Sequence, residues 1–253
     1  AGSSPYLAGL IQKEAAWVPE ALDDPEGAMA AEIARCAQFA PDALAAGLRQ
    51  GKRRVALLAA LADLGGAWSL AQVTGALTDF ADAATQAALI AGIKAQVKRG
   101  KLPGVSQDDI ETAGGMVVLA MGKMGAGELN YSSDIDLICL FDESRFDPDH
   151  YHEARAAFVR ITRNLMAIMS EVTGDGYVFR TDLRLRPDAS VTPVCIAMET
   201  AERYYESVGR TWERAAFIKA RVCAGDLVAG EAFLERLRPF VWRKHLDFAA
   251  IQD

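Results

Sequence analysis

The sequence has few cysteines, no long apolar run and no excess of basic residues, and each absence excludes a class of protein. Its four cysteines lie far apart with no Cys-x-x-Cys pair, which excludes a zinc or disulfide framework and favours a reducing, cytoplasmic location. No apolar run approaches the ~18 residues of a membrane span, and the first residues are unlike a signal peptide. Acidic residues outnumber basic ones by 34 to 27, so we expect neither a membrane nor a nucleic-acid partner.

The rest of the composition is typical of a folded, mostly helical α+β protein. Hydrophobic residues make up 51% of the 253 residues, enough to form a buried core. Residues 1–105 are rich in alanine and predict a helical N-terminal region. Within it, Ser69 and Gln72 form a capping box, which predicts that a helix begins after Ser69. Residues 106–195 predict a small α/β core, and residues 196–253 a helical C-terminal region.

Hydrophobic patterns place the elements of the core and of the C-terminal region. Strands are predicted at residues 116–121, 135–141 and 177–185. Helices are predicted at residues 128–130, 151–172, 198–208, 212–224 and 227–237. The chain is therefore expected to carry a small sheet in its middle, between two helical regions.

Acidic side chains gather on two of the predicted strands. Because side chains alternate along a strand, Asp134 and Asp136 share one face of the second strand. Asp182 shares a face of the third strand with three arginines, Arg180, Arg184 and Arg186. Three carboxylates form an oxygen-rich site that suits Mg²⁺ or Mn²⁺, and we expect two ions. Arginines beside such a site bind phosphate oxygens, so the pattern indicates phosphoryl or nucleotidyl transfer. The alternative is a solvated sheet face with salt bridges.

A glycine-rich stretch, residues 122–127, lies between the first predicted strand and these acids. It matches neither the dinucleotide fingerprint nor the Walker A loop. Backbone amides of such a stretch, with nearby hydroxyl groups, hold phosphate oxygens. The candidate phosphate-binding residues are Gly122, Lys123, Ser132, Ser133, Arg184 and Arg186.

Two basic clusters remain outside this site. Lys52, Arg53 and Arg54 follow one another on a predicted helix and are interpreted as a solvated face. The second cluster is a stripe of three arginines and one phenylalanine along the helix predicted at 212–224 and the residues just before it. Its members are Arg210, Arg214, Phe217 and Arg221. Like charges at this spacing repel, so an acidic partner is one interpretation of the stripe, and packing or surface charge is the other.

The stretch from Gly122 to Leu137 resembles the signature of glutamine synthetase adenylyltransferases. Its sequence is Gly-Lys-Met-Gly-Ala-Gly-Glu-Leu-Asn-Tyr-Ser-Ser-Asp-Ile-Asp-Leu. Further segments agree in order: Phe-Arg-Thr-Asp-Leu-Arg-Leu-Arg-Pro from Phe179, Tyr-Tyr-Glu from Tyr204, Trp-Glu-Arg from Trp212 and Lys-Ala-Arg from Lys219. The resemblance implies a nucleotidyltransferase core similar to the palm of DNA polymerase β.

The resemblance also implies an activity, partners and site residues. Family members have two related halves, one that attaches AMP to a tyrosine of glutamine synthetase and one that removes it by phosphorolysis, releasing ADP. The runs from Tyr204 to Arg214 and from Arg238 to Phe248 resemble the removing, N-terminal half, and family members continue beyond Asp253. By this resemblance Asp134, Asp136 and Asp182 hold the metal ions. The expected partners are glutamine synthetase, inorganic phosphate, ADP or AMP, and a PII-type signal protein. ATP-dependent attachment of AMP and a non-catalytic regulatory module stay open as alternatives.

Overall fold

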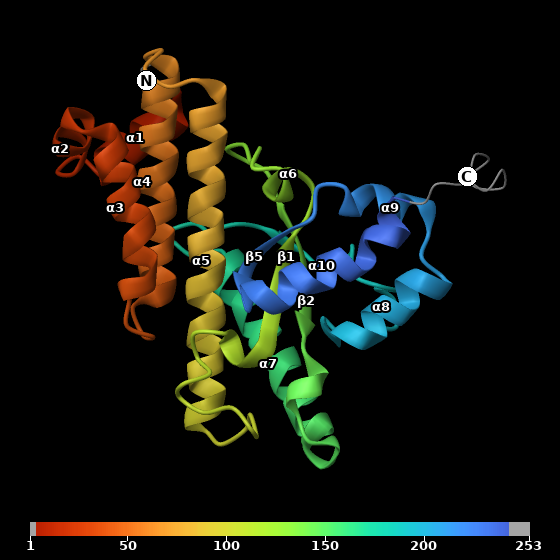
Figure 1. The fold of residues 1–253 in the computed structure, drawn as a ribbon. Coiled ribbons are helices and arrows are strands. Elements are labelled where there is room, and N and C mark those ends of the chain that lie inside the picture. Colours follow the sequence, from red (N-terminus) through yellow and green to blue (C-terminus); the bar gives the residue numbers. More distant parts are fainter. Residues whose placement is uncertain (1–3, 243–253) are drawn as a thin grey trace.

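The computed structural model describes residues 4–242, and this part of the chain forms a small mixed sheet with helices on both faces (Figure 1). The helices are α1 (Pro5–Lys13), α2 (Val18–Asp23), α3 (Pro25–Arg35), α4 (Leu44–Leu64), α5 (Leu70–Lys98), α6 (Gly122–Gly125), α7 (Tyr151–Ser170), α8 (Met198–Ser207), α9 (Thr211–Phe217) and α10 (Leu227–Val241). The strands are β1 (Met116–Ala120), β2 (Ile135–Phe141), β3 (Thr181–Asp182), β4 (Cys195–Ala197) and β5 (Arg221–Gly225). The predicted α+β class is confirmed.

Strand β2 is the centre of the sheet. One edge of β2 pairs antiparallel with β1, and the other edge of β1 pairs antiparallel with β5. Its other edge pairs in parallel with β3 near its start and with β4 near its end. The short β3 therefore lies beside the beginning of β2, where the predicted acidic residues are.

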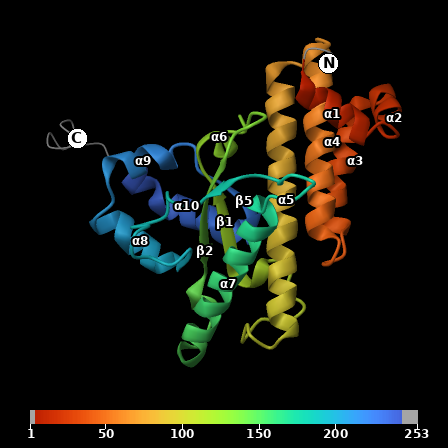
Figure 2. The ribbon, with the colours of Figure 1, turned by 180° about the vertical axis from the view of Figure 1, so that it is seen from behind.

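The two faces of the sheet are covered by different parts of the chain. Leu137 and Cys139 of β2 pack into a core with α5 and α7, whereas Ile138 and Leu140 pack into a second core with α8 and α10. Figure 2 shows the long helix α5 between the sheet and the N-terminal helices, with α8, α9 and α10 on the other side. By alternation Asp136 shares the face of Ile138, so it lies on the side of the C-terminal helices.

The N-terminal region is helical as predicted. Helix α5 begins directly after Ser69 with the predicted capping box, in which the Ser69 N–H donates to Gln72 Oε1 over 2.9 Å. Helices α4 and α5 pack against each other and α5 packs on α7, which joins this region to the sheet. Among the helices of residues 4–242, none is long and apolar enough to cross a membrane.

The strands predicted at 116–121 and 135–141 are confirmed, and so are the helices at 151–172, 198–208 and 227–237, with small shifts of their ends. The third strand is much shorter than the predicted range 177–185. The N–H of Phe179 donates to the carbonyl of Met169 at the end of α7, and the Arg184 N–H donates to the Asp182 carboxylate. These N–H groups are therefore not available for a strand ladder.

The prediction of a helix at residues 212–224 is wrong for the second half of that range. Helix α9 ends at Phe217, and β5 then joins the sheet beside β1. Pairing with a buried strand overrides the local helical preference of this segment. Arg221 consequently leaves the predicted stripe with Arg210 and Arg214, and its guanidinium forms two bonds to the Asp82 carboxylate of α5, at 2.6 and 3.0 Å.

The prediction of a short helix at residues 128–130 is also wrong. The helical turn of this region is α6, which lies within the glycine-rich stretch 122–127. Leu129 is fully buried, and its N–H donates to Thr78 Oγ1 of α5 over 3.2 Å. This tertiary bond replaces the intrahelical bond that a helix at 128–130 would need. The part of the Arg238–Phe248 run beyond residue 242 lies outside the described residues.

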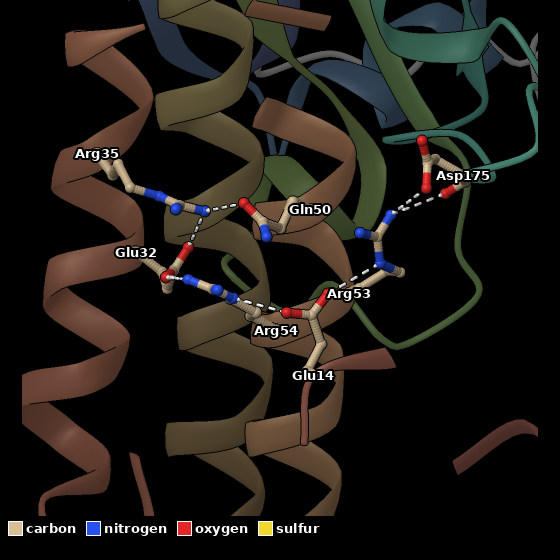
Figure 3. Close-up of polar contacts among 7 residues, drawn as sticks. All are labelled: Glu14, Glu32, Arg35, Gln50, Arg53, Arg54 and Asp175. Atoms are coloured by element: carbon tan, nitrogen blue, oxygen red, sulfur yellow. Dashed lines mark hydrogen bonds and ion pairs between the residues drawn. The ribbon is translucent and has the colours of Figure 1, made fainter. Parts of the chain in front are cut away.

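The basic cluster on α4 is not a solvated face, which corrects its interpretation from the sequence. Arg53 and Arg54 both donate to the buried carboxylate of Glu14, at 3.1 and 2.8 Å. Arg54 also binds Glu32, and Arg53 reaches Asp175 in the loop before β3 (Figure 3). These pairs tie α1, α3 and the 173–176 loop to α4. The third member of the cluster, Lys52, is buried without such a partner.

Candidate active site

Two of the three predicted acids lie directly opposite each other on neighbouring strands. Asp136 of β2 and Asp182 of β3 are partners in the register of the parallel pair. Asp134 lies two residues before Asp136, at the entrance to β2. The parallel pairing of β2 and β3 thus places the three acids at one end of the sheet.

Asp136 and Asp182 have opposite shifts of their pKa values. Partial burial, and then the negative charges of Asp182 and Asp134, raise the pKa of Asp136 above its ordinary value. Hydrogen bonds from Arg184 lower the pKa of Asp182. The surroundings therefore disfavour the negative charge of Asp136, and a cation bound beside it would offset that cost.

Arginines neutralise the other two carboxylates. Arg180 donates from Nε to Asp134 Oδ1, and its Nη2 donates to the Ser132 carbonyl over 2.8 Å. Arg184 donates from Nε to Asp182 Oδ2 over 2.7 Å. The Arg184 side chain is 86% exposed, so it is able to swing to another anion. Arg180 was absent from the candidate phosphate-binding residues, although its place on the face of Asp182 was a signal for it.

Arg186 has a different environment from the other two arginines. Its guanidinium donates to the carbonyls of Leu183, Ala189, Thr192 and Pro193, at 2.7 to 3.1 Å. These bonds hold the loop after β3 in place, so in this conformation the donors of Arg186 are engaged by backbone. A role for Arg186 in binding phosphate stays a prediction.

The glycine-rich stretch lies against the acids at its first residue. Gly122 has φ +56°, and a Cβ at this position would lie 3.2 Å from Asp136 Oδ2, so glycine permits this close approach. The side chain of Lys123 is exposed. Ser132 is exposed as well, while the Ser133 hydroxyl donates to Asn130 Oδ1 over 2.7 Å. Of these four residues Gly122 lies directly against an acid of the site, and the contact of all four with phosphate stays a prediction.

The donor set fits Mg²⁺ or Mn²⁺ in its chemistry, because all three candidate ligands are carboxylates. Among residues 4–242, however, no group of three or more His, Cys, Asp or Glu side chains is arranged to hold a metal ion. Two of the carboxylates point to arginines, as described above. Asp134 and Asp182 would therefore have to exchange their arginine partners for the ion.

Comparison with known proteins identifies the family. The family model for glutamate-ammonia ligase adenylyltransferase matches residues 1–236, nearly the whole chain. The chain belongs to this family. Its relatives include proteins named bifunctional glutamine synthetase adenylyltransferase/adenylyl-removing enzyme, from Bradyrhizobium sp. (strain ORS 278) at 52% identity, Caulobacter vibrioides at 50% and Rhodopseudomonas palustris (strain TIE-1) at 51%. Each alignment covers 99 to 100% of this chain and 26% of the relative. The chain thus spans about a quarter of the length of these adenylyltransferase relatives.

Proposed function

We propose that this chain is a nucleotidyltransferase unit that removes AMP from an adenylylated tyrosine of glutamine synthetase by phosphorolysis, releasing ADP. The observation that carries the proposal is the pairing of Asp136 with Asp182 across two strands, with Asp134 beside them. The names of the relatives, which include an adenylyl-removing activity, support the choice of reaction. Deadenylylation would place the chain in the regulation of nitrogen metabolism, and a cytoplasmic location stays a prediction.

The proposed reaction needs little acid–base help from side chains. An oxygen of inorganic phosphate forms a bond to the adenylyl phosphorus, and the bond from that phosphorus to the tyrosine oxygen breaks. The products are ADP and a tyrosine phenolate, which takes a proton from water. Because the pKa of a tyrosine phenol is about 10, the phenolate is a tolerable leaving group.

The site residues would act by neutralising negative charge. Asp134, Asp136 and Asp182 would hold one or two Mg²⁺ or Mn²⁺ ions, which when bound stabilise the negative charge of phosphoryl oxygens. Arg180 and Arg184 are exposed and bind two of these carboxylates, so rotation of their side chains would bring the guanidinium groups to phosphate oxygens. Neutralised charge allows two phosphate groups to approach each other in line.

The test is turnover by the full chain with adenylylated glutamine synthetase, Mg²⁺ and inorganic phosphate, measured as ADP release. Asp182→Asn is expected to lower kcat by at least about 10²-fold, because one of three carboxylates at the ion site is lost. Asp42→Asn is the matched control, since Asp42 is exposed and on another part of the chain. Near-normal turnover by Asp182→Asn would show that the acidic site does not do the chemistry.

The opposite modification is the second candidate: a tyrosine oxygen of unmodified glutamine synthetase bonds to the α-phosphorus of ATP, and pyrophosphate leaves, with a similar in-line geometry. It is favoured by the other activity in the names of the relatives. Labelling of unmodified glutamine synthetase by this chain with radioactive ATP would support it. Binding of a nucleotide or a PII-type protein without any turnover would instead support a regulatory module.

A further inference from the structure

The motif Lys219-Ala220-Arg221 lies beside the glycine-rich stretch, away from the three acids. Arg221 is the first residue of β5, and its guanidinium forms two bonds to the Asp82 carboxylate of α5, at 2.6 and 3.0 Å. Its Nη2 also donates to the carbonyl of Met124 in α6, over 3.1 Å. One side chain thus joins α5, α6 and β5, which are far apart in the sequence.

Helix α6 needs support from outside because it is a single turn. It has four residues, and two of them are glycines, Gly122 and Gly125, which are poor helix formers. A helix this short is not stable by itself in water, and its last carbonyls have no intrahelical donors. The Met124 carbonyl accepts from the Gly127 N–H and from the Arg221 guanidinium. The bond from Arg221 therefore ties the end of α6 to the sheet.

The turn also packs closely against the segment that carries Arg221. A Cβ at Gly125 would lie 2.0 Å from the carbonyl oxygen of Lys219, so glycine permits this contact. Lys219 also pairs with Glu128 just after the turn, but these side chains are 52% and 63% exposed, and an exposed pair contributes little. The side chains of Arg221 and Asp82 are only 34% and 23% exposed. Arg221 is therefore the charged contact whose loss should move the turn most.

The other end of α6 faces the candidate active site. Gly122 lies against the Asp136 carboxylate, and the Met121 N–H directly before it donates to the Asp136 backbone carbonyl over 2.9 Å. Only one turn of helix separates these contacts from the Met124 carbonyl. A displacement of the end of α6 is therefore expected to move Gly122 and Lys123, the predicted phosphate contacts of the turn.

We propose that Arg221 is a positioning residue of the candidate active site: by holding α6, it keeps Gly122 and Lys123 beside the acids. Asp82 orients its guanidinium. The contact of α6 with phosphate rests on the proposed function, whereas the placement of α6 by Arg221 does not. The planar fork of arginine matters here, because Nη2 bonds to the Asp82 carboxylate and the Met124 carbonyl at the same time. Lysine keeps the positive charge, but its single nitrogen does not reproduce this fork.

The first test is amide hydrogen exchange of the turn, followed by NMR in the full chain without metal or substrate. The N–H groups of Gly125 and Ala126 close the turn by their bonds to the carbonyls of Met121 and Gly122. Arg221→Lys is expected to speed their exchange by at least about tenfold, because the turn opens more often without its tether. Asp82→Asn should have a smaller effect of the same kind, since its amide oxygen still accepts one bond. Unchanged exchange in Arg221→Lys would overturn the proposal.

Arg145→Lys is the matched control. Arg145 also binds two acids, Asp109 and Asp226, and its side chain is 29% exposed, close to the value for Arg221. It follows the end of β2, whereas the candidate acids lie at the beginning of that strand. Arg145→Lys should leave the exchange of the turn unchanged. Equal acceleration in the two variants would mean a general loss of stability and would also overturn the proposal.

The second test is turnover, with urea unfolding of each variant measured beside it. Under the proposed function, Arg221→Lys is expected to lower kcat/KM for inorganic phosphate by at least about tenfold, while Arg145→Lys stays near the wild type. A residue that only stabilises the fold would lose turnover in proportion to the unfolded fraction. Near-normal kcat/KM in folded Arg221→Lys would therefore overturn the role in the site. If the wild type releases no ADP, the proposed function fails, and the exchange measurement alone decides whether Arg221 positions the turn.

Discussion

Replacing Lys52 with methionine is expected to stabilise the folded chain at neutral pH. Methionine has a similar length and keeps a favourable contact with the Phe179 ring, but it carries no charge into the buried site. The pKa of Lys52 falls from 10.5 to about 7 on folding. At about 1.4 kcal/mol per unit, the charged form of Lys52 costs about 5 kcal/mol. Because about half of the folded molecules carry a neutral Lys52 at pH 7, the net cost at that pH is about 4 kcal/mol. Replacing a poorly compensated buried charge by an apolar group often recovers about 1–4 kcal/mol.

The difference in stability between the wild type and Lys52→Met is expected to depend on pH. Because the folded-state pKa lies below the unfolded one, the unfolded chain binds more protons between about pH 7 and pH 10. The stability of the wild type relative to Lys52→Met should therefore rise with pH in this window. Between pH 7 and pH 9 the advantage of the variant should shrink by about 2 kcal/mol.

The assay is urea unfolding of both proteins at pH 6, 7, 8 and 9, in a buffer free of phosphate. Lys98→Met serves as the control for loss of an exposed lysine, and its stability should follow that of the wild type at every pH. The reasoning fails if Lys52→Met is less stable than the wild type at pH 7. It also fails if the difference between the two proteins does not change with pH.

Two further substitutions test how the sheet and the helical region are held. Arg54→Ala should destabilise the chain by about 3 kcal/mol in urea unfolding, because it leaves the buried carboxylates of Glu14 and Glu32 with fewer partners; a loss below about 1 kcal/mol would contradict this. Gly125→Ala should cost about 2 kcal/mol or more, because its Cβ would lie 2.0 Å from a backbone carbonyl. In the same assay Gly9→Ala, with nothing within 4 Å, should be neutral or slightly stabilising, and equal effects at the two glycines would refute the steric argument.

The sequence predicted the acidic residues of the site from patterns within each strand, but not how the two strands meet. Alternation along β2 is enough to place Asp134 and Asp136 on one face, and the same rule places Asp182 among arginines. What alternation does not give is the partner of each arginine. Arg184 binds Asp182, two residues away, whereas Arg180 binds Asp134 on the neighbouring segment. The contact of Arg180 with Asp134 depends on the parallel pairing of β2 and β3.

The sequence by itself determined the elements with strong local patterns, such as the capped helix α5 and the apolar strand β2. It also determined the family, because the motif residues are contiguous. Only the tertiary structure decided that residues 221–225 form a strand and that Lys52 is buried, unlike its two neighbours. Both outcomes depend on contacts between distant segments, whose free energy exceeds local preference and leaves no periodic signal in the chain.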